Sequence, residues 1–234
     1  LHGDSANNIW AGSKREGVIN IREVSMRTYT NVVLGYNKGL SQSTVLQVYQ
    51  EPGSEDLWIA TDGGGINKFI SSEETFVHYP DTWGDKMVSI SSFTPNELLV
   101  SAFSKGIFIF DKRTGKKRPL PITAASLEKS IRYSGQPINL YEDSPHSILI
   151  LSSSPYRYDV PTRKLEPVSC AENIKIKGML ASIAHDSIYT YLNDPYNIYK
   201  LDRTKNRLEI FANAPQGIYL NTVSKDSEGV FWIA

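Results

Sequence analysis

The sequence predicts an all-β fold made of four-stranded antiparallel β-propeller blades, and three observations predict it. Short segments rich in β-branched and aromatic residues recur at offsets of about 41–49 residues. Turn-forming residues separate them, as Pro52-Gly53-Ser54-Glu55 and Asp62-Gly63-Gly64 do in the clearest copy. No segment shows a helical period. A four-stranded meander of this length is typical of a propeller blade, which must stack against neighbouring blades to bury both of its faces.

The clearest repeat is predicted to form strands over residues 44–51, 57–61, 65–70 and 75–79. Its second strand, Leu57-Trp58-Ile59-Ala60-Thr61, aligns with one segment in every other repeat, which gives one second-strand segment per repeat. These segments are Asn8-Ile9-Trp10-Ala11-Gly12, Leu57-Trp58-Ile59-Ala60-Thr61, Leu98-Leu99-Val100-Ser101-Ala102, the fainter Ile148-Leu149-Ile150-Leu151, Ser187-Ile188-Tyr189-Thr190-Tyr191 and Gly229-Val230-Phe231-Trp232-Ile233-Ala234. We expect Trp10, Trp58 and Trp232 to fill the gaps between adjacent blades, because a large ring on a central strand supplies much of the core energy.

The repeats are expected to form a single β-propeller segment over residues 1–234. They cover about 1–31, 44–80, 86–120, 137–168, 178–211 and, in part, 218–234. The chain begins just before the second strand of one blade and ends on the second strand of another, so a ring closed here would hold one strand too many. We therefore expect about five blades' worth of a larger ring, for example a seven-bladed one. A closed five-bladed ring is the alternative.

Two segments closely resemble the two-component regulator propeller repeat. They are Leu57-Trp58-Ile59-Ala60-Thr61-Asp62-Gly63-Gly64-Gly65-Ile66-Asn67-Lys68-Phe69 and Val223-Ser224-Lys225-Asp226-Ser227-Glu228-Gly229-Val230-Phe231-Trp232-Ile233-Ala234. The family pattern is an Asp and a Gly before a Leu-Trp-Ile-Gly-Thr-like strand, then a Gly-Gly-Leu turn into the next strand. The match is also good in the first repeat. The third repeat keeps only the Gly and the strands, and the fourth and fifth keep little beyond the period.

The resemblance implies a parent protein, a hybrid two-component sensor of the kind found in Bacteroides-type gut bacteria. Such sensors place a periplasmic pair of propellers before a membrane helix and a histidine kinase, and they typically detect breakdown products of polysaccharides. It thus implies a periplasmic segment of an inner-membrane-anchored protein that controls transcription of carbohydrate-use genes. Its implied partners are an oligosaccharide, the remainder of the sensor kinase chain and, in the parent, a second identical chain. The segment carries no kinase motif, so we expect it not to be an enzyme.

Composition narrows the possible functions. Positive and negative side chains balance at 25 each, so the chain lacks the basic footprint of a nucleic-acid-binding protein, and we expect no nucleic-acid contact. No run approaches the roughly 18 apolar residues that span a bilayer. The single cysteine, Cys170, excludes an internal disulfide, which fits a cytosolic protein and also many periplasmic ones.

No motif for catalysis, a metal or a cofactor is found. The histidines, His2, His78, His146 and His185, have no metal-ligand spacing. The candidate carboxylates are scattered, and most of them recur near the turn after the innermost strand, which favours turn chemistry. They are Glu51, Asp56, Glu142, Asp143, Asp186 and Asp226. Asp62-Gly63-Gly64-Gly65 precedes a strand, so we interpret it as a hairpin turn and not a phosphate loop. The basic run from Lys112 to Arg118 is interpreted as a solvated turn around Gly115, in preference to an anion-binding patch.

Strand topology predicts where a ligand binds. In a four-stranded meander the loops between second and third strands share one face with the segments that lead to the next blade. The long segments here are about 31–43, 80–85, 121–136 and 169–177. Binding residues concentrate on long loops held by a rigid scaffold. The predicted binding residues on this face are Tyr36, Trp83, Arg132, Tyr133 and Tyr196. Aromatic rings beside polar groups suit the flat faces and hydroxyls of sugars, although each ring could instead pack its own loop.

Three functions remain open on the sequence. The favoured one is a periplasmic ligand-sensing module that detects an oligosaccharide. The second is a propeller that serves as a protein-interaction or dimerisation platform. The third is a secreted propeller lyase or glycosidase, which needs acidic and histidine side chains that converge on one face.

Overall fold

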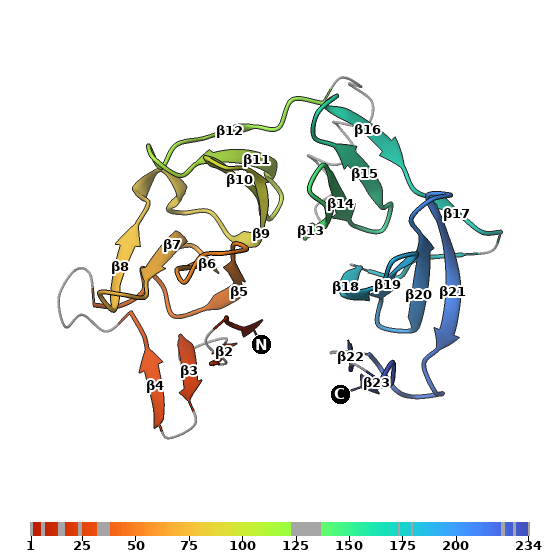
Figure 1. Ribbon diagram of the computed structural model, residues 1–234, viewed down its shortest axis with the longest axis horizontal. Coiled ribbons are helices and arrows are strands. Elements are labelled where there is room, and N and C mark those ends of the chain that lie inside the picture. The colour runs from red at the N-terminus through yellow and green to blue at the C-terminus, as the bar shows by residue number, and fades with distance from the viewer. Residues whose placement is uncertain are drawn as a thin grey trace. The chain divides into compact units, whose positions relative to one another are not determined.

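The structure is a computed structural model that describes residues 2–5, 8–13, 17–22, 25–31, 38–122, 137–172, 174–178, 180–220, 223–226 and 228–233. These residues form β-strands joined by turns, with one short 3₁₀ helix, η1 (Pro80–Thr82). Most strands belong to four-stranded antiparallel sheets whose strands follow one another along the chain (Figure 1). This arrangement confirms the predicted fold class. Ring closure and blade number stay predictions.

The chain divides into two compact units. The first comprises Leu1–Pro121 with Lys129–Leu140, and the second Ile122–Glu128 with Tyr141–Ala234. Three sheets belong to the first unit. They consist of β1 (His2–Gly3), β2 (Ile9–Gly12), β3 (Val18–Arg22) and β4 (Ser25–Tyr29); β5 (Val45–Gln50), β6 (Leu57–Thr61), β7 (Gly65–Ile70) and β8 (Thr75–His78); and β9 (Met87–Thr94), β10 (Glu97–Ala102), β11 (Gly106–Asp111) and β12 (Lys117–Pro119).

The remaining sheets belong to the second unit, except for the first two residues of β13. They consist of β13 (Asn139–Ser144), β14 (Ser147–Leu151), β15 (Tyr156–Asp159) and β16 (Lys164–Pro167); β17 (Ser169–Cys170), β18 (Ala181–His185), β19 (Tyr189–Asn193), β20 (Asn197–Asp202) and β21 (Arg207–Asn213); and the pair β22 (Val223–Lys225) and β23 (Phe231–Ile233).

Two short strands correct the expected strand order. The first repeat was expected to begin before a second strand, but β1 pairs antiparallel with β2 and supplies the first strand of that sheet. Part of the segment 169–177, expected to be a loop, forms β17, which pairs parallel with β21 at the outer edge of the fifth sheet. Each of these strands has two residues, too few to show an alternating pattern.

The second sheet shows why the sequence folds in this way. All five side chains of β6 are buried, from Leu57 to Thr61. The turn into β7 requires glycine, because Gly65 has φ +73° and a Cβ there would lie 2.1 Å from Thr82 Oγ1. A strand follows this turn, and the hairpin interpretation of Asp62-Gly63-Gly64-Gly65 is therefore confirmed.

Aromatic side chains fill the gap between adjacent sheets of the first unit. Trp10 on β2 stacks on Tyr29 at the end of β4 and meets the ring of Phe69 from the next sheet at 5.2 Å. The next gap repeats the arrangement, with Trp58 on β6, Tyr79 just after β8, and Phe110 on β11 of the third sheet. The predicted role of Trp10 and Trp58 is confirmed, since both are 2% exposed.

Trp232 on β23 does not follow this prediction. Its side chain is 63% exposed. In the first two gaps the ring is covered by a tyrosine at the end of the fourth strand and a phenylalanine on the third strand of the next sheet. The described residues contain neither of these strands after β23, so Trp232 lacks the cover that Trp10 and Trp58 have.

Carboxylates near the end of the first strand hold these rings. The indole Nε1 of Trp10 donates to Asp4 at 2.7 Å, that of Trp58 to Glu51 at 3.0 Å, and that of Trp232 to Asp226 at 2.7 Å. Turn chemistry is confirmed for Asp226, which also accepts backbone N–H groups of its own turn. The interpretation was nevertheless incomplete, because these carboxylates also fix the orientation of a ring on the second strand.

The basic run between β11 and β12 is not a solvated turn throughout. Gly115 is in the turn with φ +70°, as expected. Lys112, however, pairs with Glu51 at 2.6 Å, and Lys117 pairs with Asp85 at 2.7 Å, and both lysine side chains are only 18% exposed. The turn thus fastens the third sheet to groups that precede it in the chain. Sequence reasoning missed these pairs because their partners lie 32 to 61 residues away.

Candidate binding face

The predicted common face exists in the second and fifth sheets. In the second sheet, the turn between β6 and β7 bonds to the segment before β5, through Asp62 N to Thr44 O, and to the segment after β8, through Gly63 N to Asp85 O. In the fifth sheet, Leu220 N donates to Pro195 O in the turn between β19 and β20. In each sheet, turns and connecting segments distant in sequence therefore lie together.

Asp194 organises this face in the fifth sheet. Its carboxylate is fully buried and accepts hydrogen bonds from the backbone N–H groups of Tyr196 and Lys177, at 2.8 and 2.9 Å. It also accepts one from the Tyr199 hydroxyl at 2.6 Å. Burial, followed by this hydrogen bond, raises the pKa of Tyr199 well above its ordinary value, so the hydroxyl stays protonated and donating. One carboxylate thus joins the β19–β20 turn to the segment before β18.

Two tyrosine rings stand on this base. Tyr196 lies in the β19–β20 turn and Tyr219 in the segment between β21 and β22, and their rings meet edge to face with centroids 5.4 Å apart. Both rings reach solvent, at 38% and 59% exposure. The ammonium group of Lys177 lies 4.6 Å from the centre of the Tyr196 ring. We call Lys177, Tyr196 and Tyr219 the tyrosine platform.

The backbone holds the platform in place from both sides. Ala214 N donates to Tyr196 O at 2.7 Å, and Leu220 N donates to Pro195 O at 2.8 Å. The segment that carries Tyr219 is therefore bonded to the turn that carries Tyr196 at both of its ends. A platform fixed in this way loses little conformational entropy when a ligand binds, which favours affinity.

Trp83 occupies the corresponding face of the first unit. It follows η1, and its side chain is 48% exposed. Its loop is fixed by Gly84 N to Gly63 O and by Asp85. Burial opposes the charge of Asp85, but hydrogen bonds from Lys105 and Lys117 outweigh it and hold the pKa of Asp85 below its ordinary value. Trp83 is thus an exposed ring on a loop fastened by charged side chains.

The other predicted binding residues, Tyr36, Arg132 and Tyr133, lie outside the described residues. Sequence reasoning missed Tyr219 and Lys177. Tyr219 follows the same topological rule, because it lies in a segment between sheets, but that segment was not counted among the long ones. Lys177 lies in the segment 169–177, which the sequence did indicate as a long one. Its backbone is held near the Tyr196 ring by a hydrogen bond to Asp194, 17 residues further along the chain.

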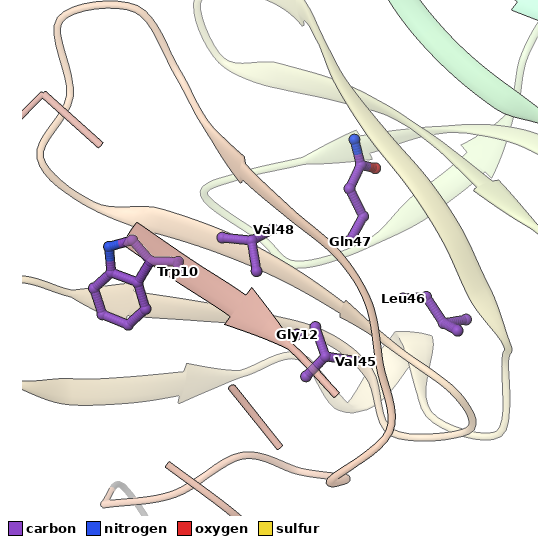
Figure 2. Close-up of a pocket in the computed structure, with 6 residues that line it drawn as sticks. All are labelled: Trp10, Gly12, Val45, Leu46, Gln47 and Val48. Atoms are coloured by element: carbon purple, nitrogen blue, oxygen red, sulfur yellow. The ribbon is translucent and has the colours of Figure 1, made fainter. Parts of the chain in front are cut away.

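Two clefts in the first unit are lined by residues other than the predicted binding residues. One, of about 320 Å³, lies along β2 and β5 and is lined by Trp10, Gly12, Val45, Leu46, Gln47 and Val48 (Figure 2). Two polar groups of its side chains have structural partners, since Gln47 Oε1 accepts from Ile90 N and the Trp10 indole donates to Asp4. The second, of about 340 Å³, also contacts Trp10, and its lining includes Asp4, Gln50 and Ser71.

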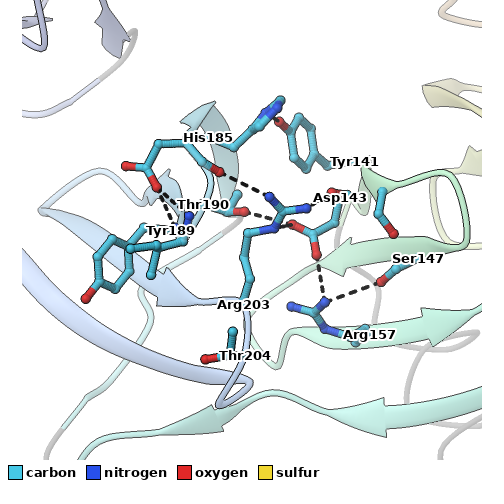
Figure 3. A network of polar contacts seen from close by, with 12 residues as sticks. Tyr141, Asp143, Ser147, Arg157, His185, Tyr189, Thr190, Arg203 and Thr204 are labelled. Atoms are coloured by element: carbon cyan, nitrogen blue, oxygen red, sulfur yellow. Dashed lines mark hydrogen bonds and ion pairs between the residues drawn. The ribbon is translucent and has the colours of Figure 1, made fainter.

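Polar side chains elsewhere in the second unit are committed to one another. Asp143 accepts from Arg157 at 2.7 Å and from Thr190 at 2.8 Å, and it pairs with Arg203 Nε at 3.2 Å (Figure 3). Its side chain is almost fully buried. This network joins the fourth sheet to the fifth, and its groups serve the packing of those sheets.

Other chemistry is limited in the part of the chain that the structure describes. No group of three or more His, Cys, Asp or Glu side chains there is placed to hold a metal ion. His78 is packed, since its Nε2 lies 2.8 Å from Gly39 O. Cys170 is a free thiol whose pKa is raised by burial.

None of the described helices is long and apolar enough to cross a membrane.

Comparison with solved structures shows the same fold in extracellular domains of two bacterial proteins. The chain superposes with a TM-score of 0.73 on the extracellular domain of BT3049 from Bacteroides thetaiotaomicron, a protein described as a hybrid two-component system. Sequence identity is 15%, over 97% of this chain and 30% of that one. For BT4673 of the same bacterium, described as a one-component system, the TM-score is 0.74 and the identity 17%, over 100% of this chain and 32% of that one. The chain thus spans about a third of the length of these domains.

An enzyme shares the fold as well. Virginiamycin B lyase from Staphylococcus aureus superposes with a TM-score of 0.72 and 9% identity, over 99% of this chain and 75% of the enzyme. No protein-family model and no curated protein matches the sequence. The resemblance noted in the repeats is confirmed at the level of the fold.

Proposed function

We propose that this chain is the ligand-binding part of an extracytoplasmic sensor and that it binds an oligosaccharide on the tyrosine platform. The observation that carries the proposal is the pair of exposed rings, Tyr196 and Tyr219, which Asp194 and the backbone hold in a fixed geometry. Aromatic rings that are rigid and partly exposed suit the flat apolar faces of sugars, while neighbouring polar groups suit their hydroxyls. The likeness in fold to sensor domains of Bacteroides thetaiotaomicron supports this choice.

In the proposed parent, the chain belongs to a periplasmic region of an inner-membrane-anchored hybrid histidine kinase. Binding of a polysaccharide fragment would then change transcription of carbohydrate-use genes through the kinase, and the parent would act as a homodimer. Since the platform contains neither a carboxylate pair nor a histidine, its proposed role is binding without chemistry. Trp83 is proposed as a second contact for sugar rings on the first unit.

A glycan screen tests the proposal. We expect at least one oligosaccharide from a panel of polysaccharide digests to raise the melting temperature of the chain, since ligand binding to the native state stabilises it. Measured by calorimetry, Tyr219→Ala should weaken binding of that glycan at least tenfold, which corresponds to about 1.4 kcal/mol in binding free energy. The control is Ile210→Ala, which removes a partly exposed apolar side chain, 44% exposed, from β21 and should leave affinity unchanged.

Two outcomes would contradict the proposal. The first is that no glycan shifts the melting temperature while the mass of the chain in solution rises with concentration, which would favour the dimerisation platform. The second is that the Tyr196→Ala and Tyr219→Ala variants bind as the unaltered chain does, which would place the glycan elsewhere. Degradation of a polysaccharide or an antibiotic by the purified chain would favour the propeller lyase.

A further inference from the structure

Lysine ammonium groups lie above aromatic rings at six places in the described residues. The lysines are Lys68, Lys86, Lys117, Lys177, Lys200 and Lys225. Five of them also have a carboxylate oxygen within 4.0 Å, from Asp56, Asp62, Asp85, Glu209 and Asp186 respectively. In these five, the ring and the carboxylate together hold the charge.

Lys177 is the exception. No carboxylate oxygen of the described residues lies within 4.0 Å of its Nζ. Its ammonium nevertheless lies 4.6 Å from its ring, closer than that of any other of these lysines except Lys225, at 4.3 Å. The nearby Asp194 binds the backbone of Lys177 instead, since its carboxylate accepts that residue's N–H at 2.9 Å from within the base of the platform. The side chain is exposed. An ammonium group on an exposed side chain therefore lies above the Tyr196 ring without the carboxylate partner that its counterparts have.

We propose that the ligand of the tyrosine platform is an acidic oligosaccharide, and that Lys177 recognises its carboxylate or sulfate group while Tyr196 and Tyr219 contact its sugar rings. This inference rests on the proposed binding function. The Tyr196 ring limits the positions open to the ammonium group, so an arriving anion meets a charge that is already placed. The anion would complete the arrangement of ring, ammonium and acid seen at the five other sites.

Matched ligands separate charge from shape. The first pair is a galacturonate oligomer and its methyl ester, which have the same rings and differ in charge. The second pair is a sulfated glycan and its desulfated form, which distinguishes sulfate from carboxylate. We expect one charged form to bind at least tenfold more tightly than its neutral partner at low salt, and the difference to shrink as salt increases. Equal affinity within both pairs would overturn the inference.

Two variants test whether Lys177 is the residue that causes the preference for the charged ligand. Lys177→Met keeps the apolar stem of the side chain and should abolish the preference for the charged form. Lys175→Met is the control, because Lys175 is an exposed lysine two residues away on the same segment and should keep the preference. A preference that survives Lys177→Met would overturn the assignment.

The two proposals fail in different ways. If neutral glycans bind through Tyr219 and charge makes no difference, the acidic-ligand inference is wrong and the binding function stands. If neither charged nor neutral glycans bind, the binding function itself is wrong. Melting curves of each variant establish that the fold is intact before affinities are compared.

Discussion

Two gaps between adjacent sheets, one in each unit of the molecule, solve the same packing problem differently. Between the first and second sheets, Trp10, Tyr29 and Phe69 form a cluster of rings closed by the bond from the indole to Asp4. Between the fourth and fifth sheets there is no tryptophan. Leucines fill the gap there, and a buried carboxylate, Asp143, is held by Arg157 and Arg203 (Figure 3).

The gap between the fourth and fifth sheets corresponds position by position to the gap between the second and third sheets, which repeats the aromatic arrangement of the first. Leu149 stands on the second strand where Trp58 stands in the second sheet, and its partner across the hairpin is Arg157. Leucine has no N–H to offer the carboxylate, and Arg157 supplies that donor from the neighbouring strand. Arg203 lies directly after the third strand, as Lys112 does in the third sheet, and each pairs with the carboxylate of the preceding sheet. The carboxylate is thus kept while its ring donor is exchanged for a guanidinium group.

This exchange explains why the motif is lost in the fourth repeat. A search for the Trp-containing strand finds the first, second and last repeats, where an indole meets a carboxylate. It loses the fourth, where an arginine on another strand has taken over the same hydrogen bond. The structure of the blade persists because the contact persists, although different residues make it.

Replacing the ring should have the largest effect. Trp58→Ala removes a fully buried ring and its contacts with Tyr79 and Phe110, so we expect a loss of about 3–5 kcal/mol in the free energy of unfolding. Denaturant titration measures this. The matched control is Trp232→Ala, which should cost less than about 1 kcal/mol because that ring is largely exposed. Equal losses at the two positions would show that burial between sheets is not what the ring contributes.

Removing the buried carboxylate between the fourth and fifth sheets should lower the free energy of unfolding somewhat less. Asp143→Ala leaves Arg157 and Arg203 partly buried without their carboxylate, and we expect a loss of about 3 kcal/mol in the free energy of unfolding. The loss is moderated because both guanidinium groups retain some contact with solvent.

A triple variant separates two contributions to stability: the loss caused by leaving buried charges unpaired, and the gain that the intact polar network provides. Asp143→Leu, Arg157→Met and Arg203→Met together should regain most of the stability, since well-packed apolar residues often replace a buried ion pair without loss. A triple variant no more stable than Asp143→Ala would mean that the polar network itself specifies how the two sheets pack.

Local patterns predicted the strands well and the partners of their side chains less well. In the second repeat the expected strands 57–61 and 65–70 match β6 and β7, because alternation and turn residues act over a few positions. On the candidate face, Tyr196 was predicted because it lies in a turn between strands. Tyr219 and Lys177 were missed, because hydrogen bonds to residues 17 or more positions away bring them to it.

At alkaline pH a smaller effect distinguishes the aromatic gap between the second and third sheets from the polar gap between the fourth and fifth. Burial, with a contribution from Asp56, raises the pKa of Tyr79 from 10.0 to about 12. Because the Tyr79 hydroxyl holds its proton more tightly in the folded state than in the unfolded state, it contributes to the free energy of unfolding. This contribution is complete below pH 10 and is lost as pH rises toward 12. Arginine keeps its charge through this range, so the guanidinium groups of the Asp143 network do not titrate with it. We expect the melting temperature of the unaltered chain to fall more steeply than that of Tyr79→Phe between pH 9 and 12, and parallel curves would show that Tyr79 does not titrate in the aromatic gap.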